Sequence, residues 1–417
     1  MEYARIPLGA AAPGGVTAGI DWASTDHAAC VVDASGTALD RFTVEHTAAG
    51  LAALVRRLRK AGVSEAAIER GDGPVVDALL AAGMTVVVIT PNQVRGLRSR
   101  YGSAGNKDDR FDAYVLADTL RTDRARLRPL EPDAPATVTL RSAVRARRDL
   151  VAHRVAACNQ LRAHLQLCFP GAVGLFADLD SPVSLAFLSR FDCQDRADWL
   201  SVRRLEAWLK AQGYCGRQKP EALHRKLTAA PRGATGDDGT TQAHVTRALL
   251  AVITTLVAQV RALEAQIAEQ LARHADAHVF TSLPRSGTVR AARLLAEIGD
   301  CRARFPTPEA LICAAGVAPS TRQSGKHKAV TFRWSADKQL RDAVCDFAGD
   351  SRRASPWAAR LYDDAISRGK DHPHAVRIVA RAWLYVIWHC WQDGVAYDPA
   401  LHKALQRILA EQKPAAA

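Results

Sequence analysis

The sequence lacks any cysteine pair with the spacing of a zinc site. It contains nine cysteines among 417 residues, and no two of them form a Cys-x-x-Cys motif. The odd number of scattered cysteines also argues against a disulfide framework. We therefore expect most of them to be small buried hydrophobic residues rather than ligands or cross-links.

Long hydrophobic runs are missing as well. No uninterrupted apolar stretch reaches the roughly 18 residues that a membrane-spanning helix requires. The first fifteen residues have neither the charged start nor the apolar block of a signal peptide. These absences predict a cytosolic protein with no membrane partner.

Acidic residues are fewer than basic ones. The chain has 43 Asp and Glu against 56 Lys and Arg, which gives a net charge of +13 and an isoelectric point near 9.6. Such an excess of positive charge favours a polyanionic partner, and nucleic acid is the first candidate. The length allows two or three domains, each with its own core.

Two of the acidic residues lie where strands are expected. Asp21 falls in the apolar run 16–32, which predicts a hairpin of two strands. Glu69 ends the short apolar run 66–68 and precedes the breakers Gly71, Gly73 and Pro74, so its carboxylate is expected at a strand end.

Two more acidic residues fall on an expected helix. Asp109 and Asp112 lie in the segment 107–118, whose apolar positions recur at helical spacing. Residues three apart share a helix face. Asp108 is four residues from Asp112 and shares that face too, so the residues alone leave Asp108 and Asp109 as alternatives.

A cluster of these carboxylates would need cations. Like charges held together raise one another's pKa values unless a metal ion neutralises them. Magnesium or manganese suits oxygen ligands, and two such ions about 3.5–4 Å apart can support phosphodiester chemistry. Taken singly, each acidic residue is equally compatible with a solvated charge or a turn.

The chain divides into segments of different pattern, with an overall fold class of α/β plus α. Residues up to about 130 alternate strand-like and helix-like runs, including a buried strand at 85–89, and later residues are mainly helical. The expected segments are a disordered extension (1–15), an α/β domain (16–130), a helical middle (131–275) with a linker near 228–241, a C-terminal domain (276–397) and a disordered tail (398–417).

The helical middle carries an excess of arginine and a heptad pattern. Between 136 and 167 a single acid, Asp149, accompanies six arginines: Arg141, Arg145, Arg147, Arg148, Arg154 and Arg162. We expect these arginines to contact nucleic acid, with a solvated helix face as the alternative. Apolar residues from 249 to 267 form a heptad seam, which can pair with the 136–167 helix or with a second copy of itself.

A serine in the C-terminal domain has the surroundings of a phosphate site. Ser324 precedes a glycine, and Arg322, Lys326 and Lys328 lie beside it. A serine among cations can attack a phosphate or bind one, and a basic loop that touches a DNA backbone is the alternative.

Together these motifs resemble the DEDD insertion-sequence transposases, serine recombinases of mobile elements that are guided by a bridge RNA. The resemblance covers about residues 17–393. It rests on GIDWAS around Asp21, AIERGDGP around Glu69, NKDDRFDAYVLAD with Asp109 and Asp112, and GVAPSTRQSGK with Ser324.

The resemblance implies a RuvC-like (ribonuclease H-like) N-terminal domain, a coiled-coil middle and a mostly helical C-terminal transposase domain. It makes the four carboxylates a metal-binding tetrad for Mg²⁺ or Mn²⁺, and it favours Asp109 over Asp108. It also makes Ser324 the nucleophile that forms a phosphoserine link to DNA. The implied partners are donor and target double-stranded DNA, a noncoding bridge RNA and further copies of the chain, as a dimer or tetramer, in the bacterial cytoplasm at the nucleoid.

Three alternatives remain open at this point. A RuvC-like nuclease or junction resolvase would use the carboxylates without a serine nucleophile. A sugar kinase or actin-like ATPase would use the Gly19–Asp21 segment and its following Ser24 and Thr25 as a phosphate loop. A transposon relic would bind nucleic acid without cutting it.

Overall fold

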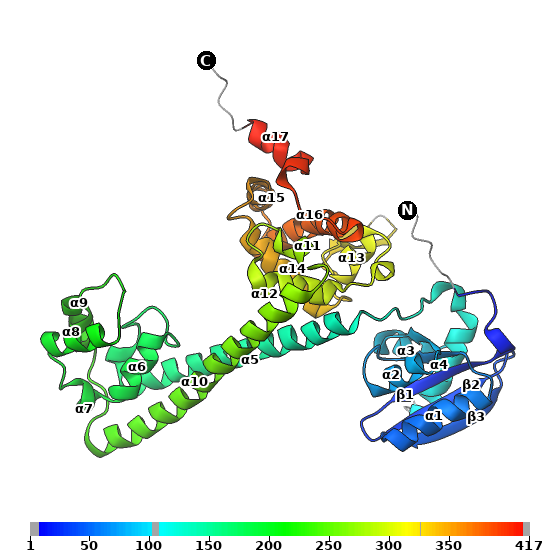
Figure 1. The fold of residues 1–417 in the computed structure, drawn as a ribbon, viewed down its shortest axis with the longest axis horizontal. Helices are drawn as coiled ribbons and strands as arrows, with labels where there is room; N and C mark the ends of the chain where they lie inside the picture. Colours follow the sequence, from blue (N-terminus) through cyan, green and yellow to red (C-terminus); the bar gives the residue numbers. More distant parts are fainter. Residues whose placement is uncertain (1–7, 102–107, 326, 412–417) are drawn as a thin grey trace. The chain divides into compact units, whose positions relative to one another are not determined.

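The computed structural model describes residues 8–101, 108–325 and 327–411, with the backbone alone at Lys328. The chain forms two compact units, Met1–Pro132 and Asp133–Ala417 (Figure 1). Each unit is described by itself.

The first unit is built on a five-stranded mixed sheet. Its strands are β1 (Thr17–Trp22), β2 (Asp26–Val32), β3 (Ala38–Glu45), β4 (Glu65–Ile68) and β5 (Thr85–Val88). Their spatial order is β3-β2-β1-β4-β5, with β1 antiparallel to β2 and parallel to β4. The predicted hairpin around Asp21 and the strand near residue 85 are both present, and the α/β class is confirmed.

Helices cover both faces of this sheet (Figure 1). They are α1 (Ala48–Lys60), α2 (Pro74–Ala81), α3 (Pro91–Arg98) and α4 (Asp109–Thr122). Side chains alternate along a strand, so Ala18 and Ile20 of β1 pack against α1 and α2. Gly19, between them, faces α4, where its missing side chain lets strand and helix approach closely.

The segment 8–15, predicted to be a disordered extension, is ordered in the structure. Leu8 packs against the core beneath α3 and α4. Arg124 donates from Nε to the Gly9 carbonyl oxygen at 2.6 Å and pairs with the buried carboxylate of Glu65. The buried guanidinium needs an acceptor for each donor, which explains why this segment is held in place. Residues 1–7 lie outside the described residues.

Two long antiparallel helices dominate the second unit (Figure 1). They are α5 (Pro135–Cys168) and α10 (Gly236–Arg273), and Arg147 of α5 binds Glu264 of α10 at 2.6 Å. The predicted heptad seam therefore pairs with the helix of its own chain. One of its rows is fully buried and consists of Ile253, Val260 and Ile267. The other row is half-buried and consists of Leu249, Leu256 and Leu263.

The linker predicted near 228–241 is shorter than expected. Helix α9 (Pro220–Ala229) continues through Ala229 and α10 begins at Gly236. Asp237 and Asp238 lie in the first turn of α10, where carboxylates interact favourably with the helix dipole. The connection is also anchored, because Ala234 donates its backbone N–H to the Cys168 carbonyl oxygen at 2.9 Å.

An insertion of short helices, which lies between α5 and α10 in the sequence, packs against the C-terminal end of α5 and the N-terminal end of α10. Its elements are η3 (Pro170–Ala172), α6 (Pro182–Arg190), α7 (Gln194–Ala197), α8 (Val202–Ala211) and α9. Aromatic and leucine side chains of the insertion form one core with residues of both long helices, among them Phe187, Trp208 and Ile253. The predicted helical insertion is thus present, and it shares one hydrophobic core with α5 and α10.

The C-terminal part of the second unit is mainly helical. Its elements are α11 (Ala277–Thr281), α12 (Gly287–Ile298), η4 (Arg302–Arg304), α13 (Pro308–Ala314), β6 (Ser320–Ser324), β7 (His327–Thr331), α14 (Lys338–Ser351), α15 (Pro356–Ser367) and α16 (His372–Asp393). Trp383 and Trp391 of α16 are fully buried. Their indole N–H groups donate to Ser351 Oγ at 2.8 Å and to the Gly299 carbonyl oxygen at 2.9 Å. These bonds satisfy the polar atoms that the aromatic core encloses.

The segment 398–411, predicted to be part of a disordered tail, is folded. It forms η5 (Pro399–Leu401) and α17 (Lys403–Glu411). Leu405 and Ile408 are buried in the C-terminal core, and the His402 ring lies edge-on to Trp357 at 4.4 Å. These apolar and aromatic contacts hold the segment in place, so the prediction of disorder was wrong for residues 398–411. Residues 412–417 lie outside the described residues.

Among the described residues, α10 alone is long and apolar enough to cross a membrane, judged by length and composition. In the structure this helix lies along α5.

Candidate active site

The sheet places two carboxylates side by side. Asp21 directly follows the buried part of β1, and Glu69 directly follows β4. These strands are parallel, and Ile20 is in register with Ile68, so Asp21 and Glu69 follow at neighbouring positions. Asp21 is two residues from Gly19, and Glu69 is two residues from Ala67, so each shares a face of the sheet with that residue. Both therefore lie on the face of the sheet that α4 covers.

Helix α4 supplies the other two carboxylates. Asp108 precedes the helix and caps it, because its Oδ1 accepts from the Arg110 backbone N–H at 3.1 Å. Asp109 and Asp112 lie in the first turn, where the helix dipole favours negative charge. The structure thus brings Asp109 rather than Asp108 into the group with Asp21.

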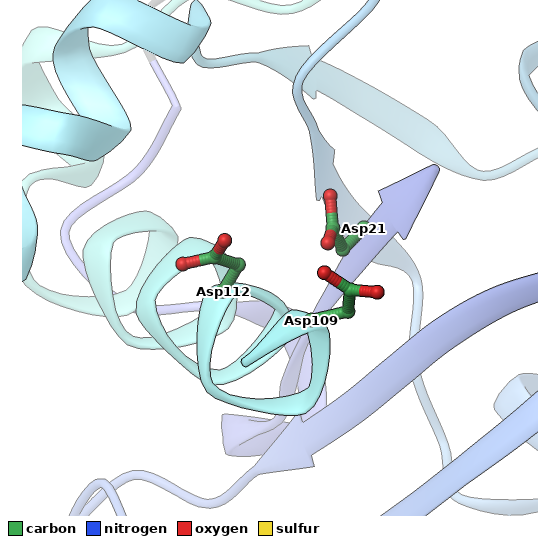
Figure 2. A group of neighbouring side chains, drawn as sticks. All are labelled: Asp21, Asp109 and Asp112. Carbon is green, nitrogen blue, oxygen red and sulfur yellow. The ribbon is translucent and has the colours of Figure 1, made fainter. Parts of the chain in front are cut away.

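Figure 2 shows the carboxylates of Asp21, Asp109 and Asp112 turned toward one another from β1 and α4. Among the described residues, these three offer oxygen atoms that all lie within 4.8 Å of one another. Glu69 lines the same cavity, whose volume is about 450 Å³. Asp109 is exposed, Asp21 and Glu69 are half-buried and Asp112 is buried, so the cavity has a solvent side and a deep side.

The donor set fits a hard divalent cation. It consists of carboxylate oxygens, and magnesium and manganese both prefer oxygen ligands. The partly exposed cavity also leaves room for water and for a substrate oxygen beside an ion. Asp21, Asp109 and Asp112 would hold such an ion, with Glu69 at the cavity wall.

Arginines line the same cavity, although no motif in the sequence pointed to them. Arg95 and Arg98 lie on α3, and both border the cavity. Arg98 holds Asp112 in a two-pronged ion pair, with its Nε donating to Asp112 Oδ1 at 2.5 Å and its Nη2 donating to Oδ2. The hydrogen-bonded carboxylate of Asp112, with Glu69 and Asp21 nearby, raises the pKa of the Arg98 guanidinium.

Ser324 lies in the second unit, at the end of β6. Ser324 pairs with His327 of β7, and Gly325, which follows Ser324, has a φ of +55°. A left-handed conformation of this kind favours glycine in a tight hairpin. The predicted basic loop is therefore a β-hairpin that exposes Ser324 at its tip, with Arg322 exposed on β6. Lys326 and the side chain of Lys328 lie outside the described residues.

Comparison with known proteins identifies the family. Residues 18–170 match a family model described as a transposase, and residues 277–363 match one described as the IS116/IS110/IS902 transposase family. The mini-circle transposase for IS117 of Streptomyces coelicolor is 32% identical over 92% of this chain and 95% of its own. The chain belongs to the IS110/IS116/IS902 family of transposases.

Further relatives carry insertion-element names. The 42 kDa protein of IS900 from Mycobacterium paratuberculosis is 28% identical to this transposase over 92% of the chain and 98% of its own. The 43.6 kDa protein of IS110 from Streptomyces coelicolor is 30% identical over 76% of this chain and 78% of its own. Among solved structures, RuvC of T. thermophilus in complex with a Holliday junction substrate is 19% identical. It covers 28% of this transposase and 99% of its own chain, with a TM-score of 0.23.

The arginines of α5 in the transposase have protein partners. Arg145 binds Glu297 through both carboxylate oxygens, at 2.9 and 2.6 Å, and Arg141 donates to the Ala296 carbonyl oxygen at 2.6 Å. The other pairs join Arg147 to Glu264, Arg148 to Asp149 and Gln339, and Arg154 to Asp180. These contacts explain why one helix carries so many arginines. Their contact with nucleic acid stays a prediction.

A histidine pair supports the strand that carries Asp21. His27 of β2 is fully buried, and its Nε2 lies 2.8 Å from His46 Nδ1. Its Nδ1 accepts from the Ala23 backbone N–H at 3.4 Å, and Ala23 lines the cavity. Burial, and then the neighbouring His46, lower the pKa of His27 below its ordinary value of 6.5, although Asp26 opposes this shift.

We expect the transposase to lose stability in mild acid through His27. The folded state binds this proton less tightly than the unfolded chain, because the pKa of His27 is lowered on folding. The free energy of unfolding should therefore fall as the pH drops below 6.5 and through the lower folded pKa. Urea unfolding of the N-terminal unit, measured between pH 7.5 and 5, should show a smaller pH dependence in His27→Phe. Equal slopes in the two proteins would contradict this expectation.

Proposed function

We propose that this transposase cuts and rejoins the DNA of its insertion sequence with Ser324 as nucleophile and the carboxylate cluster as metal-binding centre. The observation that carries the proposal is the cluster itself. In a member of a transposase family, Asp21, Asp109 and Asp112 converge in an open cavity of about 450 Å³. A site of hard oxygen donors that is open to solvent suits the phosphate backbone of a nucleic acid.

The carboxylates would hold two Mg²⁺ or Mn²⁺ ions, with Glu69 completing the set. When bound, the ions would polarise the scissile phosphate and neutralise the charge that builds up on its oxygens. The protein contributes the fixed positions of the oxygens, which β1 and the first turn of α4 provide. Asp112 is the buried anchor of the set and Asp109 is its solvent-facing member.

Ser324 would supply the covalent step. Its Oγ forms a bond to phosphorus as one bridging P–O bond of the DNA breaks, and the hydroxyl proton leaves to solvent or to the departing oxygen. The product is a phosphoserine link and a free DNA hydroxyl. Attack of a DNA hydroxyl on that phosphorus reverses the step and releases Ser324, so no energy source is needed for rejoining. The exposed hairpin tip gives Oγ access to a DNA strand.

Nucleic acid and further protein copies complete the proposal. A net charge of +13 suits donor DNA, target DNA and a bridge RNA that selects them by base pairing. Arg141, Arg145, Arg147, Arg148, Arg154, Arg322, Lys326 and Lys328 are the candidate contacts. We propose a dimer or tetramer in which Ser324 of one copy works with the carboxylates of another. The half-buried heptad row of α10 offers a surface for such assembly.

Covalent trapping tests the proposal. Full-length protein is incubated with the neighbouring noncoding RNA, Mg²⁺ and labelled target DNA, and SDS-resistant protein–DNA adducts are measured. We expect an adduct in the wild type and none in Ser324→Ala. Ser320→Ala is the matched control, since Ser320 begins the same strand and its replacement should leave the adduct intact.

The alternatives give different results. Metal-dependent cleavage without an adduct, unchanged in Ser324→Ala, would overturn the serine mechanism and support the resolvase-like nuclease. Nucleic-acid binding without cleavage under all conditions would support a transposon relic that no longer cuts DNA. Adduct formation that does not need the RNA would remove the guide from the proposal. Membership of a transposase family argues against the kinase alternative.

A further inference from the structure

The cavity that holds the carboxylates has a basic wall. Arg95 and Arg98 are three residues apart on α3, so they share a helix face, and both border the cavity. Thr90 and Gln93 form a capping box at the start of α3, with the Thr90 backbone N–H donating to Gln93 Oε1 at 2.9 Å. The wall therefore belongs to a well-defined helix rather than to a loose loop.

The Arg98 guanidinium binds the most deeply buried carboxylate of the site. The side chain of Asp112 is 2% exposed, and both of its oxygens accept from Arg98. A divalent ion on Asp112 would draw charge away from the oxygens that Arg98 uses and would place a second positive charge beside the guanidinium, so metal binding weakens this ion pair. The Arg98 side chain is 28% exposed, so it has a solvent side toward which it can move.

The displaced guanidinium would still be a cation beside the cavity. Arginine keeps its charge at all ordinary pH values, and its planar fork matches two phosphate oxygens as well as two carboxylate oxygens. A phosphodiester drawn to the metal centre brings such oxygens to the same place. The group that neutralises Asp112 without metal is thus suited to hold the substrate once metal is bound.

We propose that Arg98 exchanges partners, from Asp112 in the metal-free protein to a DNA phosphate in the metal-loaded one, with Arg95 as a second phosphate contact. This inference rests on the proposed function. It makes the basic wall of α3 a phosphodiester-binding site whose availability depends on the metal. Metal and DNA then bind cooperatively, because each favours the state in which Arg98 has left Asp112.

The exchange predicts opposite effects of one substitution on two ligands. In Arg98→Ala, Asp112 has no guanidinium to displace, so Mn²⁺ should bind the DNA-free protein at least about tenfold more tightly. The same protein should bind duplex DNA in the presence of Mn²⁺ about tenfold more weakly. A purely structural role for Arg98 would weaken both affinities.

The experiment measures Mn²⁺ affinity by calorimetry without nucleic acid, and DNA affinity at fixed salt by anisotropy. Arg98→Lys keeps the positive charge but lacks the planar guanidinium. Its Mn²⁺ affinity and its DNA affinity should both lie between those of the wild type and of Arg98→Ala. Arg100→Ala is the charge-matched control, because Arg100 pairs with Asp123 outside the cavity. It should leave Mn²⁺ affinity unchanged and lower DNA affinity less than Arg98→Ala does.

The outcomes separate this inference from the proposed function. Unchanged or weaker Mn²⁺ binding in Arg98→Ala overturns the exchange, as does unchanged DNA binding. If Arg98→Ala fails to fold without metal, Arg98→Lys decides alone, and wild-type Mn²⁺ affinity in that variant overturns the exchange. Mn²⁺ affinity that is the same in Asp109→Asn as in the wild type would show that the cluster is no metal site, and the proposed function would fail with it.

Discussion

Asp109→Asn is expected to reduce metal-dependent DNA cleavage by about a thousandfold or more, whereas Asp108→Asn should retain nearly all of it. The two residues are neighbours with the same side chain. Asp109 places its carboxylate within 4.8 Å of those of Asp21 and Asp112. Asp108 instead caps α4 with its side chain. Asparagine caps a helix about as well as aspartate, so Asp108→Asn should preserve the helix.

Three measurements check this pair of variants. Cleavage of labelled DNA at several Mg²⁺ concentrations gives the loss of activity. Calorimetry with Mn²⁺ should show weaker binding in Asp109→Asn alone. Thermal unfolding without metal should show Asp109→Asn to be as stable as the wild type or more so, since one of several crowded negative charges is gone. Equal loss of activity in the two variants would contradict the assignment and give Asp108 a role of its own.

The first unit was the most predictable part of the fold, for a physical reason. Strands buried on both faces appear as short apolar runs, and a one-sided helix repeats its apolar residues every 3.6 positions; these patterns predicted β1, β5 and α4. The hairpin β6–β7 left a weaker signal, since both strands are short and largely exposed. The terminal segments were wrongly predicted because few contacts decide their order. Leu8 at one end, and Leu405 with Ile408 at the other, hold these segments against the rest of their units.

The candidate site was predictable in its acidic half and not in its basic half. Asp21, Glu69, Asp109 and Asp112 stand at strand ends and a helix start, positions that local sequence reveals. Arg98 reaches Asp112 from another helix through a long side chain, and nothing in the local sequence of α3 distinguishes it from any other surface arginine. The arginines of α5, in contrast, stood out in the sequence, but the sequence did not predict their contacts. Their number suggested nucleic acid, while some of their carboxylate partners, such as Glu297 for Arg145 and Glu264 for Arg147, lie far away in the sequence.

Gly19→Ala should dismantle the same site without touching any of its carboxylates. A Cβ atom at residue 19 would overlap the Ala113 carbonyl oxygen and the Ala117 amide nitrogen of α4, and it would lie 2.7 Å from Leu116 Cβ. Two of these atoms are backbone, so no side chain can rotate to make room. β1 and α4 would have to separate, at an expected cost of about 3 kcal/mol or more in the free energy of unfolding of the first unit.

The separation would also move Asp21 away from Asp109 and Asp112, since each strand or helix carries its carboxylates with it. Mn²⁺ affinity and DNA cleavage should therefore fall together, and amide hydrogens of α4 should exchange faster with solvent. Gly96→Ala is the matched control: a Cβ atom at residue 96 meets nothing within 4 Å, and alanine favours the helix there by up to about 1 kcal/mol. If Gly19→Ala kept the stability and the Mn²⁺ affinity of the wild type, close packing of β1 on α4 could not be what brings the carboxylates together.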